Sequence, residues 1–157
     1  MIEVNGSSMA QCAEKEVYDR SAVRQQKIEG KKIMPEKGRL CGNNRPKDSA
    51  AMTDFEKKHM PEIDCPDTVK AGEPFQVKIK VGSIPHVMED GHFIQWIEVK
   101  FGESLYTRIE LTPTLSQPDV AVTLVKGAKH HKGTLRVIER CNLHGAWEAT
   151  KEIIITD

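Results

Sequence analysis

The segment FQVKIKV, residues 75–81, decides the fold class of this chain. Its apolar residues alternate strictly with polar ones, and it is bounded by Gly72-Glu73-Pro74 on one side and by Gly82 on the other. Successive side chains of a β-strand point to opposite faces of a sheet, so this alternation predicts a strand with one buried face. Residues 92–101 form a second such segment. Its first half is apolar on both faces, which predicts a central place in a sheet.

In this second segment we expect Ile97 and Val99 on one face and Ile94 and Trp96 on the other. Further short apolar segments follow, separated by Gly and Pro, and they cover residues 105–111, 120–124, 135–141 and 147–156. No long helical pattern interrupts them. We therefore predict an all-β fold, an immunoglobulin-like antiparallel β-sandwich of about seven strands.

The first third of the chain has a different composition. Residues 11–32 are polar and highly charged, and a helix near residues 13–28 would have too thin an apolar stripe for a core of its own. Residues 34–51 are rich in Pro, Gly, Asn and Lys, which is typical of a linker. We predict a mostly irregular or partly helical N-terminal extension over residues 1–52, without an intact metal site. The sandwich domain is predicted over residues 53–157, and it begins with a charged loop that ends at Pro61.

Composition narrows the class of protein. The chain has 157 residues, which suits one domain plus an extension. Lys+Arg and Asp+Glu both number 23, and this balance argues against nucleic acid or an anionic membrane as the main partner. No apolar run approaches the ~20 residues that span a bilayer. The N-terminus also lacks the charged start and apolar stretch of a signal peptide.

The four cysteines, Cys12, Cys41, Cys65 and Cys141, are widely and irregularly spaced. This is not the dense pattern of a small secreted module, so we predict reduced thiols and a cytoplasmic location. Cys65 is expected to be a small buried hydrophobic residue. For Cys12 and Cys41 free thiols are the default expectation, and a regulatory or intermolecular disulfide is the alternative.

Candidate metal-binding residues occur in the segment Cys141-Asn142-Leu143-His144-Gly145. Its cysteine and histidine are three residues apart, and the glycine lets the backbone turn tightly enough to aim both side chains at one metal ion. Three further histidines, His59, His86 and His92, lie at loops or strand ends upstream. Five ligands are too many for a closed, four-coordinate zinc site. Nitrogen-rich ligation with one thiolate suits redox-active iron or copper better, and four nitrogens in a plane would leave the position opposite the sulfur open for a small substrate.

These motifs resemble those of the superoxide reductases, the family of neelaredoxin and of the C-terminal domain of desulfoferrodoxin. The matching pieces are Lys58-His59-Met60-Pro61, Pro85-His86-Val87-Met88, residues 92–97 and residues 141–145. The resemblance covers residues 53–157. It implies one mononuclear non-haem iron per chain, cycling between Fe2+ and Fe3+, with His59, His86, His92 and His144 as equatorial ligands and Cys141 as the axial ligand.

The resemblance also implies an activity and partners. The reaction is the one-electron reduction of superoxide to hydrogen peroxide, with a rubredoxin-like or other small protein as electron donor. The family is commonly dimeric or tetrameric, so a homo-oligomer is expected. Because the N-terminal extension lacks paired cysteines, the resemblance is to a one-iron form.

Two further residues follow from the same resemblance. Lys58 resembles the family's lysine near the open site, where a cation attracts the superoxide anion. The family usually has Glu-Lys-His, with the glutamate as sixth ligand of the oxidised iron. Here the order is Glu56-Lys57-Lys58-His59, so a lysine holds that position. Glu56 is therefore a tentative ligand that would need the loop to shift by one residue.

Two other functions compete with this interpretation. A cupredoxin-like electron-transfer protein also pairs a β-sandwich with Cys and His ligands, but it normally adds a methionine after the last histidine, and no methionine follows Cys141. A non-catalytic immunoglobulin-like binding module would leave the five ligands unexplained. His130 and His131 match no ligand position and are expected in an exposed turn. Trp96 and Trp147 are expected to pack in the core or beside the metal ligands.

Overall fold

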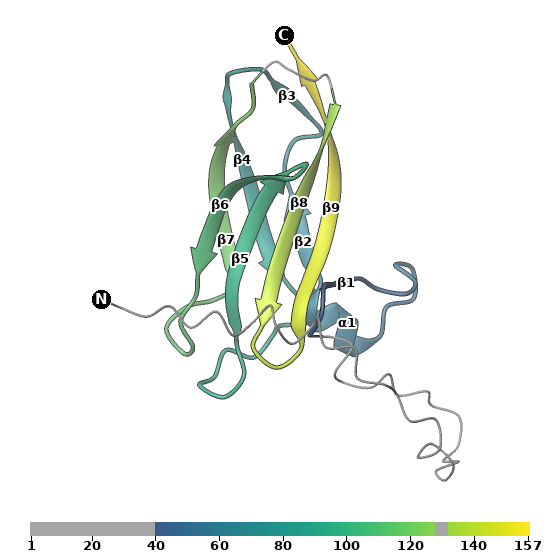
Figure 1. Ribbon diagram of the computed structural model, residues 1–157, viewed down its shortest axis with the longest axis vertical. Helices are drawn as coiled ribbons and strands as arrows, with labels where there is room; N and C mark the ends of the chain where they lie inside the picture. The colour runs from purple at the N-terminus through teal and green to yellow at the C-terminus, as the bar shows by residue number, and fades with distance from the viewer. Residues whose placement is uncertain (1–39, 128–131) are drawn as a thin grey trace, which may run out of the picture. The chain divides into compact units, whose positions relative to one another are not determined.

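The computed structural model describes residues 40–127 and 132–157, which form a sandwich of two β-sheets (Figure 1). The elements are β1 (Asn43–Asn44), α1 (Asp54–His59), β2 (Pro61–Asp64), β3 (Thr68–Lys70), β4 (Pro74–Val81), β5 (Ile94–Phe101), β6 (Ser104–Glu110), β7 (Asp119–Val125), β8 (Lys132–Cys141) and β9 (Gly145–Thr156). The larger sheet has the order β1-β9-β8-β5-β6, with β3 also paired to β9, and the smaller sheet is β2-β4-β7.

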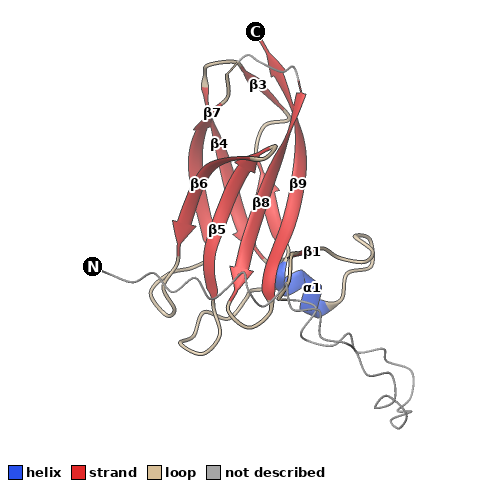
Figure 2. Cartoon of the chain, in the orientation of Figure 1, coloured by secondary structure: helices blue, strands red, loops and turns tan. Residues whose placement is uncertain are grey.

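The predicted all-β sandwich is confirmed, since α1 is the one short helix among the described residues (Figure 2). β1 and β3 run parallel to β9, and the other strand pairs are antiparallel. Within this part of the chain no helix is long and apolar enough to cross a membrane.

The core lies between the two sheets and follows the alternation that predicted it. Every second residue of β4 is buried, and Val77 and Ile79 are completely so. They share one apolar cluster with Ile97, Val99 and Val137 of the larger sheet. Removing a Val or Ile side chain from water stabilises a fold by ~1.5–3 kcal/mol, so these strands have little freedom to shift register.

One face assignment in β5 is wrong. The pairing of β5 with β8 shifts register between Ile94 and Trp96, and this β-bulge turns Ile94 into the core together with Ile97. Trp96 is only half-buried, and the guanidinium of Arg108 lies 4.3 Å from the centre of its ring. The expected core position of Trp96 is therefore wrong as well. A bulge of one residue reverses the faces, and the alternation pattern does not show where it occurs.

The charged segment before Pro61, expected to be a loop, is mostly the six-residue helix α1. Thr53 and Glu56 form a capping box, in which each side chain accepts a hydrogen bond from the other residue's backbone N–H. Acidic residues lie in the first turn and basic ones in the last, as the helix dipole favours. At the end of the helix, the N–H of Gly82 donates to the carbonyl of Met60 at 3.0 Å. Gly82 has φ +86°, and a Cβ there would lie 2.7 Å from the carbonyl oxygen of Lys58, so this close approach requires glycine.

The described end of the predicted linker carries structure of its own. β1 pairs with β9 through Asn43 opposite Ala146 and Asn44 opposite Trp147. Cys41 is disulfide-bonded, so the default expectation of a free thiol is wrong at this position, whereas Cys65 and Cys141 are free and buried. The expectations for Cys12, for a helix near residues 13–28 and for His130 and His131 lie outside the described residues.

Candidate metal centre

Five side chains from four separate segments converge at one end of the sandwich. His59 ends α1, His86 and His92 lie in the loop between β4 and β5, Cys141 ends β8, and His144 lies in the turn before β9. One nitrogen of each histidine and the sulfur of Cys141 all lie within 4.8 Å of one another. The five residues are the ones expected to bind a metal, so the structure brings that whole set together.

The four imidazoles surround a common centre. Ring centroids are 4.8 Å apart for His59–His86, 4.7 Å for His86–His92, 4.8 Å for His92–His144 and 4.8 Å for His144–His59. Neighbouring ring planes cross at 76° to 89°. The rings therefore form a closed circuit in which each is nearly perpendicular to the next, and their nitrogens converge on the centre.

For two of the four rings, a backbone carbonyl determines which nitrogen turns inward. The Nδ1 of His59 lies 2.7 Å from the carbonyl of Phe55, and the Nδ1 of His86 lies 2.6 Å from the carbonyl of Val87. An Nδ1–H that donates to a carbonyl leaves Nε2 as the bare nitrogen, which is the tautomer a metal ligand needs. The two Nε2 atoms are 3.3 Å apart, and the Nε2 of His59 is 3.0 Å from the Nδ1 of His144. The buried Nε2 of His92 has no hydrogen-bond partner among the described residues.

The electrostatics of the site favour neutral imidazoles. Burial, and then the nearby histidines, lower the pKa of His59 to about 3, although the Phe55 carbonyl acts in the opposite direction. Burial and the neighbours of His86 lower its pKa to about 4. Neutral rings whose bare nitrogens face each other at close range repel by their lone pairs, and a cation between them removes that repulsion. This donor set fits a metal ion.

Cys141 completes the donor set. Its side chain is 0% exposed, and its sulfur is 3.5 Å from the Nδ1 of His144. Burial raises the pKa of the thiol, and the N–H groups of Leu143 and His144 partly offset this by donating to the sulfur. Gly145 closes the turn with φ +81°, which confirms the role expected for glycine there. A buried thiol with a raised pKa ionises readily only beside a cation, so the sulfur also fits a metal ligand.

Asn142 is a supporting residue that sequence reasoning missed. Its side-chain oxygen accepts from the N–H of Phe93 at 2.9 Å, and its Nδ2 donates to the carbonyl of Gly91 at 3.0 Å. Asn142 thus ties the turn that carries Cys141 to the loop that carries His92. Its position between the two candidate ligands of the C-x-x-H motif was the available signal.

Aromatic side chains enclose the centre on the side of α1. Trp147 stacks on His59 with ring centroids 5.1 Å apart and planes 22° apart. Phe55 contacts His59, His144 and Trp147 at centroid distances of 4.6 to 5.6 Å. Trp147 lies beside the ligands as expected, and these rings exclude water from one flank of the site.

Two buried carboxyl groups near the site were also missed. Glu139 lies two residues before Cys141, is 0% exposed, and its oxygens have no hydrogen-bond partner in the described part of the chain. Burial raises its pKa well above the ordinary value, which favours the protonated form of this carboxyl group. Glu148 is 2% exposed, follows Trp147 and is hydrogen-bonded to Arg45, Asn43 and Arg136. A strand pattern shows which face a residue occupies but not which distant partners cover it.

Lys58 and Glu56, the two other expected site residues, lie in different surroundings. Lys58 is exposed, and after burial its charge is among the causes that lower the pKa values of His86 and His92. Glu56 is not among the converging residues. Its carboxylate accepts from the N–H and hydroxyl of Thr53, both at 2.8 Å, and from the N–H of Lys47 at 3.2 Å.

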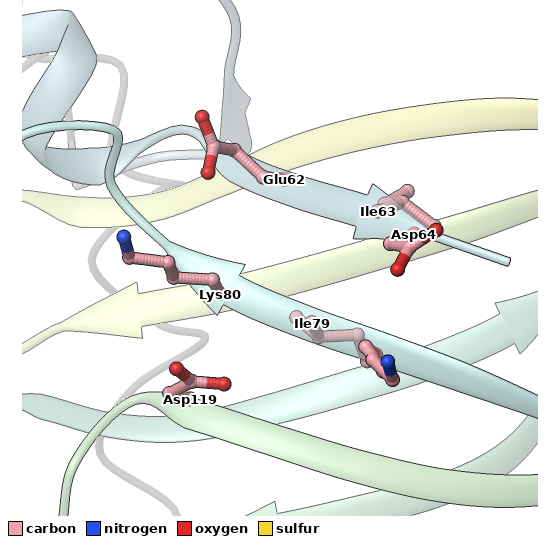
Figure 3. A pocket seen from close by; sticks show the side chains of 7 residues that line it. Glu62, Ile63, Asp64, Ile79, Lys80 and Asp119 are labelled. Atoms are coloured by element: carbon pink, nitrogen blue, oxygen red, sulfur yellow. The ribbon is translucent and has the colours of Figure 1, made fainter.

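A hollow elsewhere on the surface is separate from this centre. It encloses about 270 Å³ on the β2–β4–β7 sheet and is lined by residues 62–64, 78–80 and Asp119 (Figure 3). Carboxylates and lysines alternate across it, with Lys80 between Glu62 and Asp119 on neighbouring strands. It contains none of the five converging side chains, and its charges form a solvated face.

Comparison with known proteins identifies a family and several relatives to which this chain is similar. The desulfoferrodoxin family matches residues 51–150, a range that contains all five converging residues. A protein of Methanocaldococcus jannaschii named "Putative superoxide reductase" is 49% identical over 116 residues, which cover 73% of this chain and 96% of that protein. A superoxide reductase of Pyrococcus horikoshii is 35% identical over 102 residues, covering 59% of this chain and 84% of that protein.

Solved structures agree with the sequence matches. The superoxide reductase (neelaredoxin) of Ignicoccus hospitalis superimposes with a TM-score of 0.57 and 42% identity, covering 62% of this chain and 81% of that structure. A structure from Thermotoga maritima, described as a "putative superoxide reductase", has a TM-score of 0.58 and 30% identity. The match covers 67% of this chain and 92% of that structure. The range matched by the family, residues 51–150, contains the loops of the candidate metal centre and most of the sandwich.

Proposed function

Because this chain belongs to the desulfoferrodoxin family, we propose that it is a superoxide reductase, an oxidoreductase that converts superoxide to hydrogen peroxide. The observation that carries the proposal is the convergence of four imidazoles and one buried thiol, whose ligand atoms all lie within 4.8 Å of one another. Each turnover consumes one superoxide anion, one electron and two protons, and yields one hydrogen peroxide.

We propose one mononuclear iron per chain, held by His59, His86, His92, His144 and Cys141. The Nε2 atoms of the first three and the Nδ1 of His144 are the nitrogens available to it. Iron in such a set of ligands supplies one-electron redox chemistry, to which the thiolate adds electron density. The carbonyls of Phe55 and Val87 orient His59 and His86, and Asn142 holds the Cys141 turn in place.

Lys58 is the residue that we propose acts on the substrate. Superoxide is a small anion, and an exposed ammonium group whose charge acts on His86 and His92 would raise the local concentration of this anion at the centre. The same group stabilises negative charge as it develops on the product and holds water from which protons are delivered. The Glu56 carboxylate is engaged in three hydrogen bonds at the start of α1, so nothing in its surroundings supports the tentative role as sixth ligand.

The reaction needs an external electron, and we propose a rubredoxin-like or other small carrier as donor. Leu143 supports an entry point at the Cys141 turn, because it is 53% exposed and lies between two ligand residues. We also propose a homo-oligomer, dimer or tetramer, and a cytoplasmic location. The buried free thiols of Cys65 and Cys141 support a reducing compartment, whereas the disulfide at Cys41 is the observation that opposes it.

The deciding experiment combines metal analysis with kinetics. The full chain is purified without added metal, its metal content is measured, and the reduced protein is mixed with pulsed superoxide in a stopped-flow instrument. We expect one iron per chain and one peroxide formed per superoxide consumed. Stoichiometric copper would instead support a cupredoxin-like electron carrier, and absence of any stoichiometric metal would refute both functions.

A further inference from the structure

Residues 43–48, called the strap from here on, begin with β1, the strand at the edge of the larger sheet. Within the strap, β1 pairs in parallel with the first residues of β9, and the Nδ2 of Asn44 donates to the carbonyl of Ala146 at 2.7 Å. Figure 1 shows β1 next to both β9 and α1. β1 is therefore paired with the residues that directly follow the turn of Cys141 and His144.

Glu148 anchors the strap to the sheet. Its carboxylate accepts hydrogen bonds from Asn43 and from Arg45, both at 2.7 Å, and from the Nε of Arg136 at 2.9 Å. The side chain of Glu148 is 2% exposed and that of Arg45 is 63% exposed, and charge-assisted hydrogen bonds are stronger than neutral ones. Two of the three donors belong to the strap, so Glu148 holds it from one end.

The other end of the strap meets the helix that carries His59. The N–H of Lys47 donates to the Oε1 of Glu56 at 3.2 Å, while the other oxygen of Glu56 closes the capping box with Thr53. Trp147 connects the strap to the centre, because it is the pairing partner of Asn44 in β1 and its ring stacks on His59. The strap thus contacts both segments that build this side of the centre.

A helix as short as α1 depends on such contacts. It has six residues, and helices shorter than ~12 residues are not stable on their own in water. Its position relative to β9 must come from tertiary contacts, and it carries both His59 and Lys58. A shift of α1 would move a metal ligand and the cation beside the site together.

We propose that the strap is a positioning device, which fixes α1 against the start of β9 through Glu148 and Glu56. Both glutamates are positioning residues in this assignment, and Glu56 acts through the helix and not as a metal ligand. The identity of the metal rests on the proposed function, whereas the attachment of α1 by the strap does not.

The main test removes the strap's own donors and leaves the Glu148–Arg136 pair intact. In the variant N43A/R45A, the backbone amides of α1 are expected to exchange with solvent at least about fivefold faster in the metal-free protein. Release of bound Fe2+ to a chelator is expected to accelerate to a similar extent. The matched control is Glu103→Gln, which removes another carboxylate partner of Arg136 without touching the strap. Unchanged exchange and release in N43A/R45A, or equal effects in the control, would overturn the proposal.

Glu56 is tested by a conservative pair of variants. Glutamine can also accept from the Thr53 N–H in a capping box, so Glu56→Gln should keep slow amide exchange, slow metal release and the thiolate-to-iron absorption band. Glu56→Ala should behave like N43A/R45A. A changed iron spectrum in Glu56→Gln would show that the carboxylate binds the metal, and would overturn its assignment as a positioning residue.

Two measurements distinguish a failure of the strap proposal from misfolding of the variant and from failure of the proposed function. Circular dichroism and thermal unfolding check that N43A/R45A is folded, and Arg45→Ala alone, at the exposed side of the anchor, is the milder variant if it is not. A wild-type protein that binds no iron would refute the proposed function. The exchange experiment on the metal-free protein would still decide whether the strap holds α1.

Discussion

At the scale of single residues, the centre depends on the tautomer of each histidine and on the protonation of the cysteine thiol. His59 and His86 present Nε2 because their Nδ1–H groups are already used by backbone carbonyls. Cys141 is the one soft donor among five, and it is buried where a thiol without a cation would stay protonated. Its replacement therefore tests the electronic role of the site more directly than loss of any single histidine.

Cys141→Ser should abolish both superoxide reductase turnover and the thiolate-to-iron charge-transfer band. A serine hydroxyl is a poor ligand for this purpose and donates less electron density to iron. Absorption spectra of the oxidised protein and stopped-flow kinetics measure the two effects. Cys65→Ala is the matched control, because Cys65 is also buried and free but is not among the converging residues. A Cys141→Ser variant that kept the band would contradict the assignment of the sulfur.

Lys58→Ala should slow the reaction with superoxide by about tenfold at low ionic strength and weaken its dependence on salt. The physical reason is that a local cation steers an anion, and added salt screens that attraction. Rates are measured over a series of salt concentrations. Lys57→Ala serves as control, since Lys57 pairs with Asp54 at 3.6 Å on the same helix. Equal rates for wild type and Lys58→Ala at low salt would remove Lys58 from the mechanism.

At the scale of elements, the first residues of β9 contact the neighbouring strands, the candidate metal centre and the strap. It follows the ligand turn, pairs with β1 and β8, and presents Trp147 to the metal centre and Glu148 to the strap. Burial alone would raise the pKa of Glu148, but hydrogen bonds from Arg136, Asn43 and Arg45 outweigh it and lower the pKa to about 2. The ionisation of Glu148 therefore makes the stability of the fold around β9 depend on pH.

The sign of that link follows from the direction of the shift. A carboxyl whose folded-state pKa is below its ordinary value of 4.5 stabilises the fold above pH 4.5, and this contribution is lost as the pH falls toward 2. We expect the metal-free protein to lose up to about 3 kcal/mol from this group over that window. Urea unfolding at a series of pH values measures the slope, which should be shallower in Glu148→Gln. Glu103→Gln, an exposed carboxylate on the same arginine, should keep the wild-type slope; an equal slope in all three proteins would contradict the assignment.

At the scale of the whole molecule, the division of the chain into an extension over residues 1–52 and a domain over residues 53–157 stays a prediction. The pairing of β1 with β9 leads us to expect that the domain needs residues before 53. A protein of residues 40–157 should therefore unfold at a higher temperature than one of residues 53–157. Loss of the strap's hydrogen bonds is expected to cost about 2 kcal/mol, or a fall of about 5–10 °C in Tm. Calorimetry of the two proteins gives the comparison, and equal Tm values would support the boundary at residue 52.

Much of the fold and the site was predictable because it is encoded locally. The alternation in residues 75–81 specifies which face of β4 is buried, whatever its partner. The types and spacing of His59, His86, His92, Cys141 and His144 specify a metal site, since few other arrangements use four imidazoles and one thiolate. The family resemblance then favoured iron over copper and indicated superoxide reduction as the reaction.

The sequence by itself therefore determined the sandwich, the five candidate ligands and the chemistry that such a set of side chains suits. Only the tertiary structure decided the bulge that turns Ile94 inward, the place of Trp96 and the engagement of Glu56 in a helix cap. It alone showed the strap, in which Asn43 and Glu148 are hydrogen-bonded although 105 positions apart. The physical reason is that a local pattern specifies which side of an element is apolar. Which distant segment covers that side depends on the packing of the whole chain.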